Sequence, residues 1–252
     1  AVGILNSPDP SYNPECDPCL PFSYGPRNYS EGKTRNKRNL QKELGLIEDE
    51  RAPLFFWPSR LDRIQKGSPL MAHILYDVVS KYWNRPLQIV FVANGEFQIY
   101  LRQIVGQFHL SDRVAVCDFD EGLSRRSYAA SDFTLMPSAF EPCGLPQMIA
   151  PIYGSLPVAR DTGGIHDTIR QINIEKKTGN GILFETYDPP GLRWAIDQAI
   201  GFFELPKKTR DKQLARIMSE SLAIFNHQVT ARNYIDLYEK MLDRPFITRP
   251  SV

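Results

Sequence analysis

The sequence predicts an α/β fold built on a doubly wound parallel sheet. Short apolar runs recur along the chain, and the segments between them carry apolar residues at helical spacing. Alternation of strands and helices favours right-handed βαβ units, and hence a mostly parallel sheet with helices on both faces. The chain has 252 residues and 42% hydrophobic content, which is ordinary for a globular protein of one large or two small domains.

Six apolar runs are predicted to be buried strands. They lie at residues 54–57, 88–92, 114–117, 133–136, 156–159 and 181–184. Helical spacing follows the first two runs, in the residues Leu70, Ile74, Leu75 and Val78 and then Leu101, Ile104, Val105 and Phe108. The tail beyond residue 190 is helical in pattern, and its last helix carries Tyr234, Leu237, Tyr238 and Met241.

The chain divides into three predicted segments. Residues 1–50 form a lead-in, which opens in what we interpret as the end of a strand and continues through residues 7–30 as an ordered, irregular loop outside the core. Residues 51–190 form the α/β core, and residues 191–252 are helices of the same domain. The abrupt start predicts that the chain is a fragment of a longer protein.

Composition and charge argue against several classes of function. A formal charge of +1 gives no general attraction to nucleic acid or lipid, and the chain has no run of about 18 apolar residues. The basic cluster at residues 33–38 is interpreted as the solvated start of a helix, because it lacks interleaved aromatic residues. Cys16 and Cys19 have metal-ligand spacing, but no second pair follows, so we expect no metal site and reduced surface thiols.

Polar turns follow several of the predicted strands. Glu141 and Gly144 follow the fourth, Arg60 and Lys66 lie in the loop after the first, and a glycine pair follows the fifth. Gly95 lies in a tight turn after the second. Two cations can neutralise a diphosphate, a carboxylate can accept hydrogen bonds from hydroxyls, and glycine lets backbone approach a ligand.

Each of these features alone has a structural explanation. The carboxylate could cap a helix, the cations could be solvated surface charges, and the glycines could serve only as turns. Carboxyl ends of parallel strands meet at one edge of a sheet, where ligands of open α/β folds bind. The coincidence of these turns on one edge therefore favours a site for a sugar attached to a phosphate.

The motifs resemble those of the bacterial glycogen synthase and plant starch synthase family. The resemblance rests on Ser-Arg-Leu and Gln-Lys-Gly at residues 59–67, Pro-Ser-Ala-Phe-Glu-Pro-Cys-Gly-Leu at 137–145, and Thr-Gly-Gly at 162–164. These motifs follow the order and spacing of the family, and the resemblance runs from about residue 3 to the final helix. It implies the Rossmann-like C-terminal half of a GT-B glycosyltransferase, which binds the nucleotide sugar.

The resemblance also implies a reaction and its partners. Family members transfer glucose from ADP-glucose to the non-reducing end of an α-1,4-glucan with retention of configuration, release ADP, and need no metal or other cofactor. The missing N-terminal domain would supply the rest of the active site, so the fragment would be inactive alone. No nucleic acid or membrane partner is implied, and the compartment would be the bacterial cytoplasm or the plant plastid stroma.

Residue roles follow from the same resemblance. Arg60 and Lys66 would hold the diphosphate, and Glu141 would orient the donor glucose. The remaining contacts would come from Cys143, Gly144, Leu145, Thr162, Gly163, Gly164 and Gly95, with Phe119 stacked on adenine.

The sequence departs from the family at several positions. The loop between Leu61 and Gln65 is about one residue longer than in bacterial members, and Pro146 replaces a frequent threonine, which removes an amide donor. Two alternatives therefore stay open. One is a UDP-sugar-dependent retaining GT-B transferase, and the other is a non-catalytic sugar-binding module.

Overall fold

The computed structural model describes residues 2–243 and residue 245. A six-stranded, all-parallel sheet forms its centre, in the strand order β3-β2-β1-β4-β5-β6. The strands are β1 (Leu54–Trp57), β2 (Gln88–Val92), β3 (Val114–Cys117), β4 (Phe133–Met136), β5 (Leu156–Arg160) and β6 (Ile182–Phe184). All six predicted strands are confirmed to within one residue at each end.

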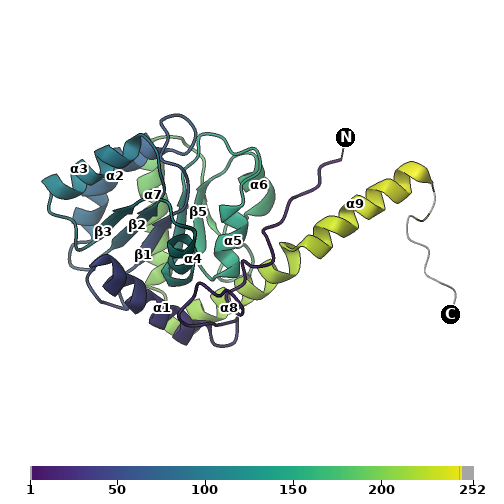
Figure 1. Ribbon diagram of the computed structural model, residues 1–252, viewed down its shortest axis with the longest axis horizontal. Coiled ribbons are helices and arrows are strands. Elements are labelled where there is room, and N and C mark those ends of the chain that lie inside the picture. Colours follow the sequence, from purple (N-terminus) through teal and green to yellow (C-terminus); the bar gives the residue numbers. More distant parts are fainter. Residues whose placement is uncertain (1, 244, 246–252) are drawn as a thin grey trace.

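Helices cover both faces of the sheet (Figure 1). One group packs together and comprises α2 (Ser68–Lys81), α3 (Phe97–Gln107) and α7 (Pro189–Phe203). The other comprises α1 (Tyr29–Leu44), α4 (Glu121–Ala130), α5 (Pro146–Ile152) and α8 (Lys207–Ile224). The short α6 (Gly164–Thr168) follows β5, and α9 (His227–Leu242) ends the described chain. The predicted doubly wound α/β architecture is confirmed.

Side chains of the central strands form most of the core. Every residue of β1 is buried, as is every residue of β4. The rings of Phe55 and Phe133 stack between these two strands with their centroids 4.8 Å apart, and Trp57 packs against Phe91 of β2. Strands buried on both faces read as continuous apolar runs, which is why the sequence located them so closely.

The lead-in segment differs from its prediction. Leu20 and Tyr24 are buried in the core, and the Tyr24 hydroxyl donates to the carbonyl oxygen of Tyr153 over 2.8 Å. Residues 2–9 form no strand, because no neighbouring strand lies beside them to complete a ladder. Instead, the carbonyl oxygen of Leu5 accepts a hydrogen bond from Thr230 of α9 over 3.1 Å.

The basic cluster at residues 33–38 is not a solvated helix start. α1 begins earlier, at Tyr29, and turns Lys33 and Lys37 into the protein while Arg35 and Arg38 face solvent. The Lys33 Nζ donates to the carbonyl oxygens at the ends of α4 and α5, at 3.3, 3.2 and 3.0 Å, which belong to Tyr128, Ala129 and Tyr153.

These carbonyls lie where helix dipoles place partial negative charge, so they suit an ammonium donor. Burial nevertheless lowers the pKa of Lys33 to about 7. Lys37 is also buried, and its Nζ lies 2.6 Å from an oxygen of Asp132. The cluster thus joins α1 to the sheet and to the helices beside it.

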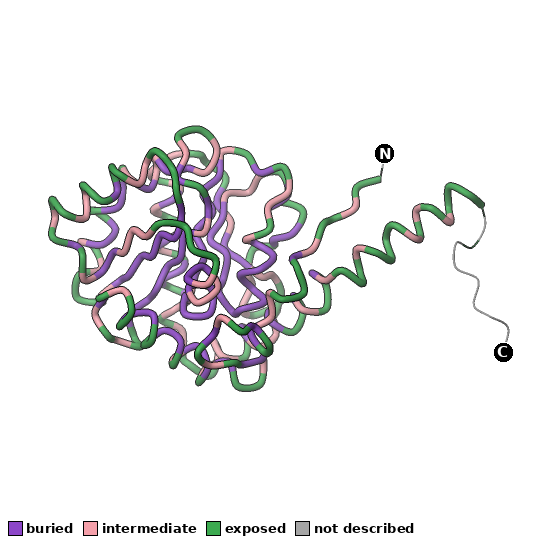
Figure 2. The backbone as a smooth tube through the Cα atoms, viewed as in Figure 1, coloured by how far each residue is buried: buried purple, intermediate pink, exposed green. Residues whose placement is uncertain are grey.

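The last helix extends away from the rest of the fold (Figures 1 and 2). None of the described residues of α9 is buried, and its exposed apolar side chains include Tyr234, Tyr238, Met241 and Leu242. No described helix combines the length and the apolar character that crossing a membrane requires.

Candidate functional site

The strand order places the loops after β1 and β4 next to each other. β1 lies between β2 and β4, so the chain continues from β1 toward one side of the sheet and from β4 toward the other. Ligands of open α/β folds bind in the crevice that forms at this switch point, beyond the carboxyl ends of the strands. Lys66 follows β1 and Glu141 follows β4, so both lie at this crevice.

Lys66 and Glu141 form an ion pair at the switch point. The Lys66 Nζ lies 2.6 Å from the Glu141 Oε2, and the side chains are only 13% and 5% exposed. The hydroxyl of Ser138 donates to the same oxygen over 3.2 Å. These two donors hold the buried Glu141 side chain in place, and a ligand hydroxyl that reaches it could donate a further charge-assisted hydrogen bond.

Glycines bring the loops close enough for this contact. Gly67 has a φ of +81°, and a Cβ on it would meet the carbonyl oxygen of Pro137 at 2.1 Å. Gly95 has a φ of +151°, and a Cβ there would lie 2.4 Å from the carbonyl oxygen of Leu61. Side chains at these positions would separate the loops after β1, β2 and β4.

Arg60 lies in the same loop as Lys66 but does not touch Glu141. Its side chain is 73% exposed, and its Nη2 donates to the Gln65 Oε1 over 3.2 Å. The Gln65 side chain in turn approaches the carbonyl oxygen of Phe140, the residue before Glu141, at 3.4 Å. The largely exposed guanidinium of Arg60 therefore keeps N–H donors that an anion could use.

The glycine pair after β5 closes over the Glu141 loop. Gly163 has φ +49° and ψ −127°, and a Cβ on it would lie 2.2 Å from the carbonyl oxygen of Glu141. The amide of Gly164 donates to that oxygen over 2.7 Å, and a Cβ on Gly164 would lie 2.0 Å from the carbonyl oxygen of Cys143. Thr162 is half-buried next to this pair.

The turn before α5 presents the next predicted residues. Gly144 has a φ of +78°, and the Gln147 side chain donates to the carbonyl oxygens of Cys143 and Gly144, at 2.8 and 3.0 Å. Leu145 is 43% exposed. Residues 143–145 line one wall of a hollow of about 450 Å³, whose other wall comes from Asn6, Ser7, His227 and Thr230.

Phe119 lies farther along the same edge, beyond β3. Its ring is 53% exposed, and its amide donates to the Asn94 Oδ1 over 2.9 Å. Hydrogen bonds from Gln98 and then Arg102 hold the pKa of the neighbouring Asp118 below its usual value, so that carboxylate stays ionised. The exposed ring of Phe119 can stack on a base. The Asp118 carboxylate beside it can accept hydrogen bonds from that base or from a ribose.

Two residues that support the site were not assigned a role from the sequence. Ser138 holds Glu141, as described above. Arg160, at the end of β5, donates from its Nη1 to the carbonyl oxygen of Ala139 over 2.6 Å and from its Nε to that of Glu185 over 3.0 Å. Arg160 thereby joins the loops after β4 and β6. The sequence did offer one signal for Arg160, since it is a charged residue at the end of a buried apolar strand.

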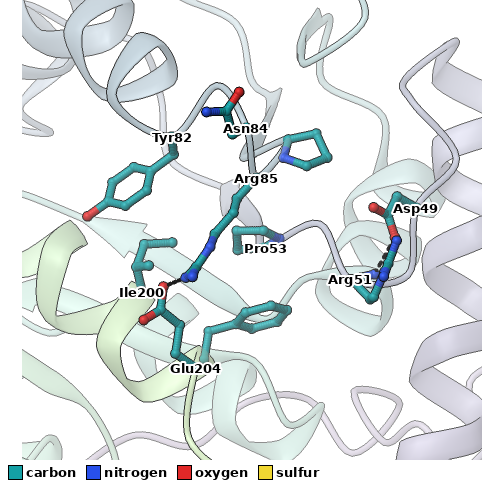
Figure 3. Close-up of a pocket in the computed structure, with 10 residues that line it drawn as sticks. Asp49, Arg51, Pro53, Tyr82, Asn84, Arg85, Ile200 and Glu204 are labelled. Atoms are coloured by element: carbon teal, nitrogen blue, oxygen red, sulfur yellow. Dashed lines mark hydrogen bonds and ion pairs between the residues drawn. The ribbon is translucent and has the colours of Figure 1, made fainter.

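A separate pocket of about 460 Å³ lies at the opposite, amino-terminal edge of the sheet (Figure 3). Pro53 and Pro86, which precede β1 and β2, are part of its lining. Its charges pair with one another, as Arg85 with Glu204 and Arg51 with Asp49. The lining of this pocket is apolar or ion-paired, whereas the carboxyl edge presents the exposed Arg60 and several polar turns.

Residues 2–243 and 245 offer little to a metal ion. Within them, no group of three or more His, Cys, Asp or Glu side chains is arranged to hold a metal ion. Cys16 and Cys19 are both free thiols, the first exposed and the second half-buried.

Comparisons with known proteins fit this geometry. The family described as "Glycosyl transferases group 1" matches residues 52–201. Glycogen synthase of Syntrophotalea carbinolica is 37% identical over 248 residues, which cover 96% of this chain and 48% of that protein. Glycogen synthase of Bacillus subtilis is 39% identical over 205 residues, 80% of this chain and 41% of that protein. The chain thus spans about half the length of these curated relatives.

Solved structures give the same result. The catalytic domain of starch synthase IV from Arabidopsis thaliana, bound to ADP and acarbose, superposes with a TM-score of 0.81 at 34% identity. That match covers 96% of this chain and 49% of the other. Sucrose-phosphate synthase from Thermosynechococcus elongatus matches with a TM-score of 0.58 at 23% identity, over 81% of this chain and 49% of the other, which shows a shared fold.

Proposed function

The chain belongs to the glycogen and starch synthase family of glycosyltransferases, as a GT-B C-terminal domain, and we propose that it binds the nucleotide sugar for glucan synthesis. The donor is ADP-glucose, and the complete protein transfers its glucose to the non-reducing end of an α-1,4-glucan with retention of configuration. The observation that carries the proposal is the contact between Lys66 and Glu141 at the switch point.

The ion pair suits a donor that carries both a diphosphate and a sugar. Without ligand, the Lys66 ammonium neutralises Glu141. A diphosphate entering beside Lys66 shares that ammonium, and the exposed fork of Arg60 turns to take a second phosphate oxygen. Glu141 then accepts hydrogen bonds from glucose hydroxyls, which orients the anomeric carbon.

The same groups account for departure of the nucleotide. As the bond between glucose and diphosphate breaks, negative charge grows on the departing ADP. Lys66 and Arg60 stabilise that charge more in the transition state than in the ground state, which lowers the barrier. The glycines of residues 162–164 and the turn at 143–145 line the donor pocket, Gly95 keeps the loops close, and Phe119 stacks on adenine.

The acceptor and the remaining active-site groups come from a facing domain. Relatives are about twice as long as this chain, and α9 extends away from the sheet (Figure 1) with exposed apolar residues that such a domain would cover. Glucosyl transfer needs groups from both walls of a cleft within reach of one carbon. The 252-residue chain is therefore expected to bind ADP and not to elongate glucan. No metal or other cofactor is part of the proposal.

Calorimetric titration of the chain with ADP and with UDP tests the donor. ADP should bind, UDP should bind at least about tenfold more weakly, and Lys66→Met should weaken ADP binding. In the protein that includes the facing domain, Lys66→Ala should lower turnover by about 10², the effect of losing one preorganised electrostatic contact. Lys208→Ala, which removes an exposed lysine of α8, is the matched control. Preference for UDP, or full turnover of Lys66→Ala, would contradict the proposal.

A further inference from the structure

The loop that carries Lys66 is organised by one carboxylate. The Asp62 Oδ1 accepts hydrogen bonds from three successive backbone amides, those of Ile64, Gln65 and Lys66, at 3.1, 2.6 and 3.2 Å. A single oxygen that gathers three amides fixes the backbone between them, and the last of the three belongs to the residue that pairs with Glu141.

Apart from Asp62, the loop is held by hydrogen bonds at its two ends. Its start is anchored by Leu61, whose amide and carbonyl pair with the backbones of Asn94 and Phe97, and by the Arg63 amide on Glu96. Its end is anchored where the amide of Ala139 donates to the carbonyl oxygen of Gln65 over 2.7 Å. Between these anchors the described contacts of the backbone amides at 64–66 go to Asp62.

The second oxygen of Asp62 is also informative. The Asp62 Oδ2 is buried and has no hydrogen-bond partner, and the Arg60 Nη2 lies 4.0 Å from it. Leaving a buried carboxylate oxygen without a partner costs free energy, which the three hydrogen bonds to the Asp62 Oδ1 must offset.

We propose that Asp62 is a positioning residue for donor binding, which holds the loop in the shape that aims Lys66 at Glu141. The inference rests on the proposed function, because Lys66 is the group that meets the diphosphate. Asp62 itself does not touch the donor. Removing the Asp62 carboxylate frees the loop backbone. Part of the binding free energy of the donor is then used to order Lys66, so the affinity falls.

Two substitutions at Asp62 separate loop shape from charge. Asp62→Asn keeps an oxygen that can accept from the three amides and removes the charge. Asp62→Ala removes the acceptor altogether. The matched control is Asp49→Ala, because the Asp49 Oδ1 likewise accepts a loop amide, that of Arg51 at 2.8 Å, but lies by the pocket at the opposite edge of the sheet.

Calorimetry with ADP gives the first readout on the 252-residue chain. Asp62→Ala should weaken ADP binding by about tenfold, Asp62→Asn by less than about threefold, and Asp49→Ala should leave it unchanged. Equal losses in Asp62→Ala and Asp62→Asn would overturn the proposal, because charge beside Arg60 would then matter rather than loop shape. Wild-type affinity in Asp62→Ala would also overturn it.

The ¹⁵N resonance of the Lys66 ammonium gives a second readout that needs no nucleotide. A buried ion pair slows exchange of the ammonium protons with water, so the signal should appear in the wild type and in Asp62→Asn and vanish in Asp62→Ala. Persistence of the signal in Asp62→Ala overturns the inference. If the wild type fails to bind ADP, the proposed function fails, while this resonance still decides whether Asp62 positions Lys66.

Discussion

Breaking the Lys66–Glu141 pair one side at a time should reveal strong coupling between the two residues. The perturbations are Lys66→Met, Glu141→Gln and the double substitution, each close in volume to the native side chain. The pair is short, at 2.6 Å, and largely buried. Each single substitution leaves one buried group without its partner, whereas the double substitution leaves two neutral side chains.

The structure sets the expected size of these effects. Removing one partner of a buried ion pair destabilises a protein by about 3–5 kcal/mol. Ser138 still donates to Glu141 in Lys66→Met, so we expect the lower end of that range, about 3 kcal/mol. The double variant should lose less than the sum of the single losses, with a coupling free energy of about 1–3 kcal/mol.

Urea unfolding near neutral pH measures the stabilities, and calorimetry on the same samples measures ADP affinity. The double variant should be more stable than the summed single losses predict, while its ADP binding should stay as weak as that of Lys66→Met, since both lack the ammonium that meets the diphosphate. Free energies that add to within about 0.5 kcal/mol would refute the reasoning, because residues that do not interact give additive effects. Recovery of ADP affinity in the double variant would remove Lys66 from the donor site.

The buried Lys33 should make the stability of the protein depend on pH. Unfolded Lys33 keeps its proton up to its ordinary pKa of 10.5, while folded Lys33 releases it above about 7, so wild-type stability should rise across this window. Relative to Lys33→Met, the rise should approach about 1.4 kcal/mol per pH unit, measured by urea unfolding; parallel pH profiles would contradict it. Gly163→Ala should lower the free energy of unfolding by at least about 2 kcal/mol and weaken ADP binding, because its Cβ meets the Glu141 carbonyl. Gly45→Ala, where φ is also positive but the space is open, should lower it by about 1 kcal/mol. Equal losses in thermal unfolding would rule out the clash. Adding EDTA should leave the ADP dissociation constant unchanged, and a severalfold increase would show that a metal takes part.

The sequence predicted the sheet well because the strands are buried on both faces. Continuous apolar runs such as that of β1 are typical of strands covered by helices on both faces. The helical character of the tail was also predicted, since α9 repeats its apolar residues at helical spacing, but its exposure was not.

The lead-in was harder to predict because its role depends on partners far along the chain. Lys33 lies about 95 residues before Tyr128 and 120 before Tyr153, which supply its acceptors. Pattern alone cannot distinguish a lysine that faces water from one that spans two helix ends. Tyr24 was missed for the same reason, since its hydroxyl also bonds to Tyr153.

At the candidate site, motifs predicted which residue types gather but not how they contact one another. Arg60 and Lys66 looked equivalent in sequence, yet Lys66 is paired with Glu141 and Arg60 is largely exposed. Loop shape makes this difference, and the shape depends on hydrogen bonds of Asp62, a residue without a motif of its own.

The buried ammonium of Lys33 bears on where this unit can be excised from a gene. A clone trimmed to the family match would start at residue 52 and would delete α1. Three carbonyl groups would then lose Lys33 as their donor, and the apolar surface that Leu40 and Tyr24 cover would be exposed to water. A piece that keeps these contacts must therefore start upstream of α1, well before the boundary that homology marks.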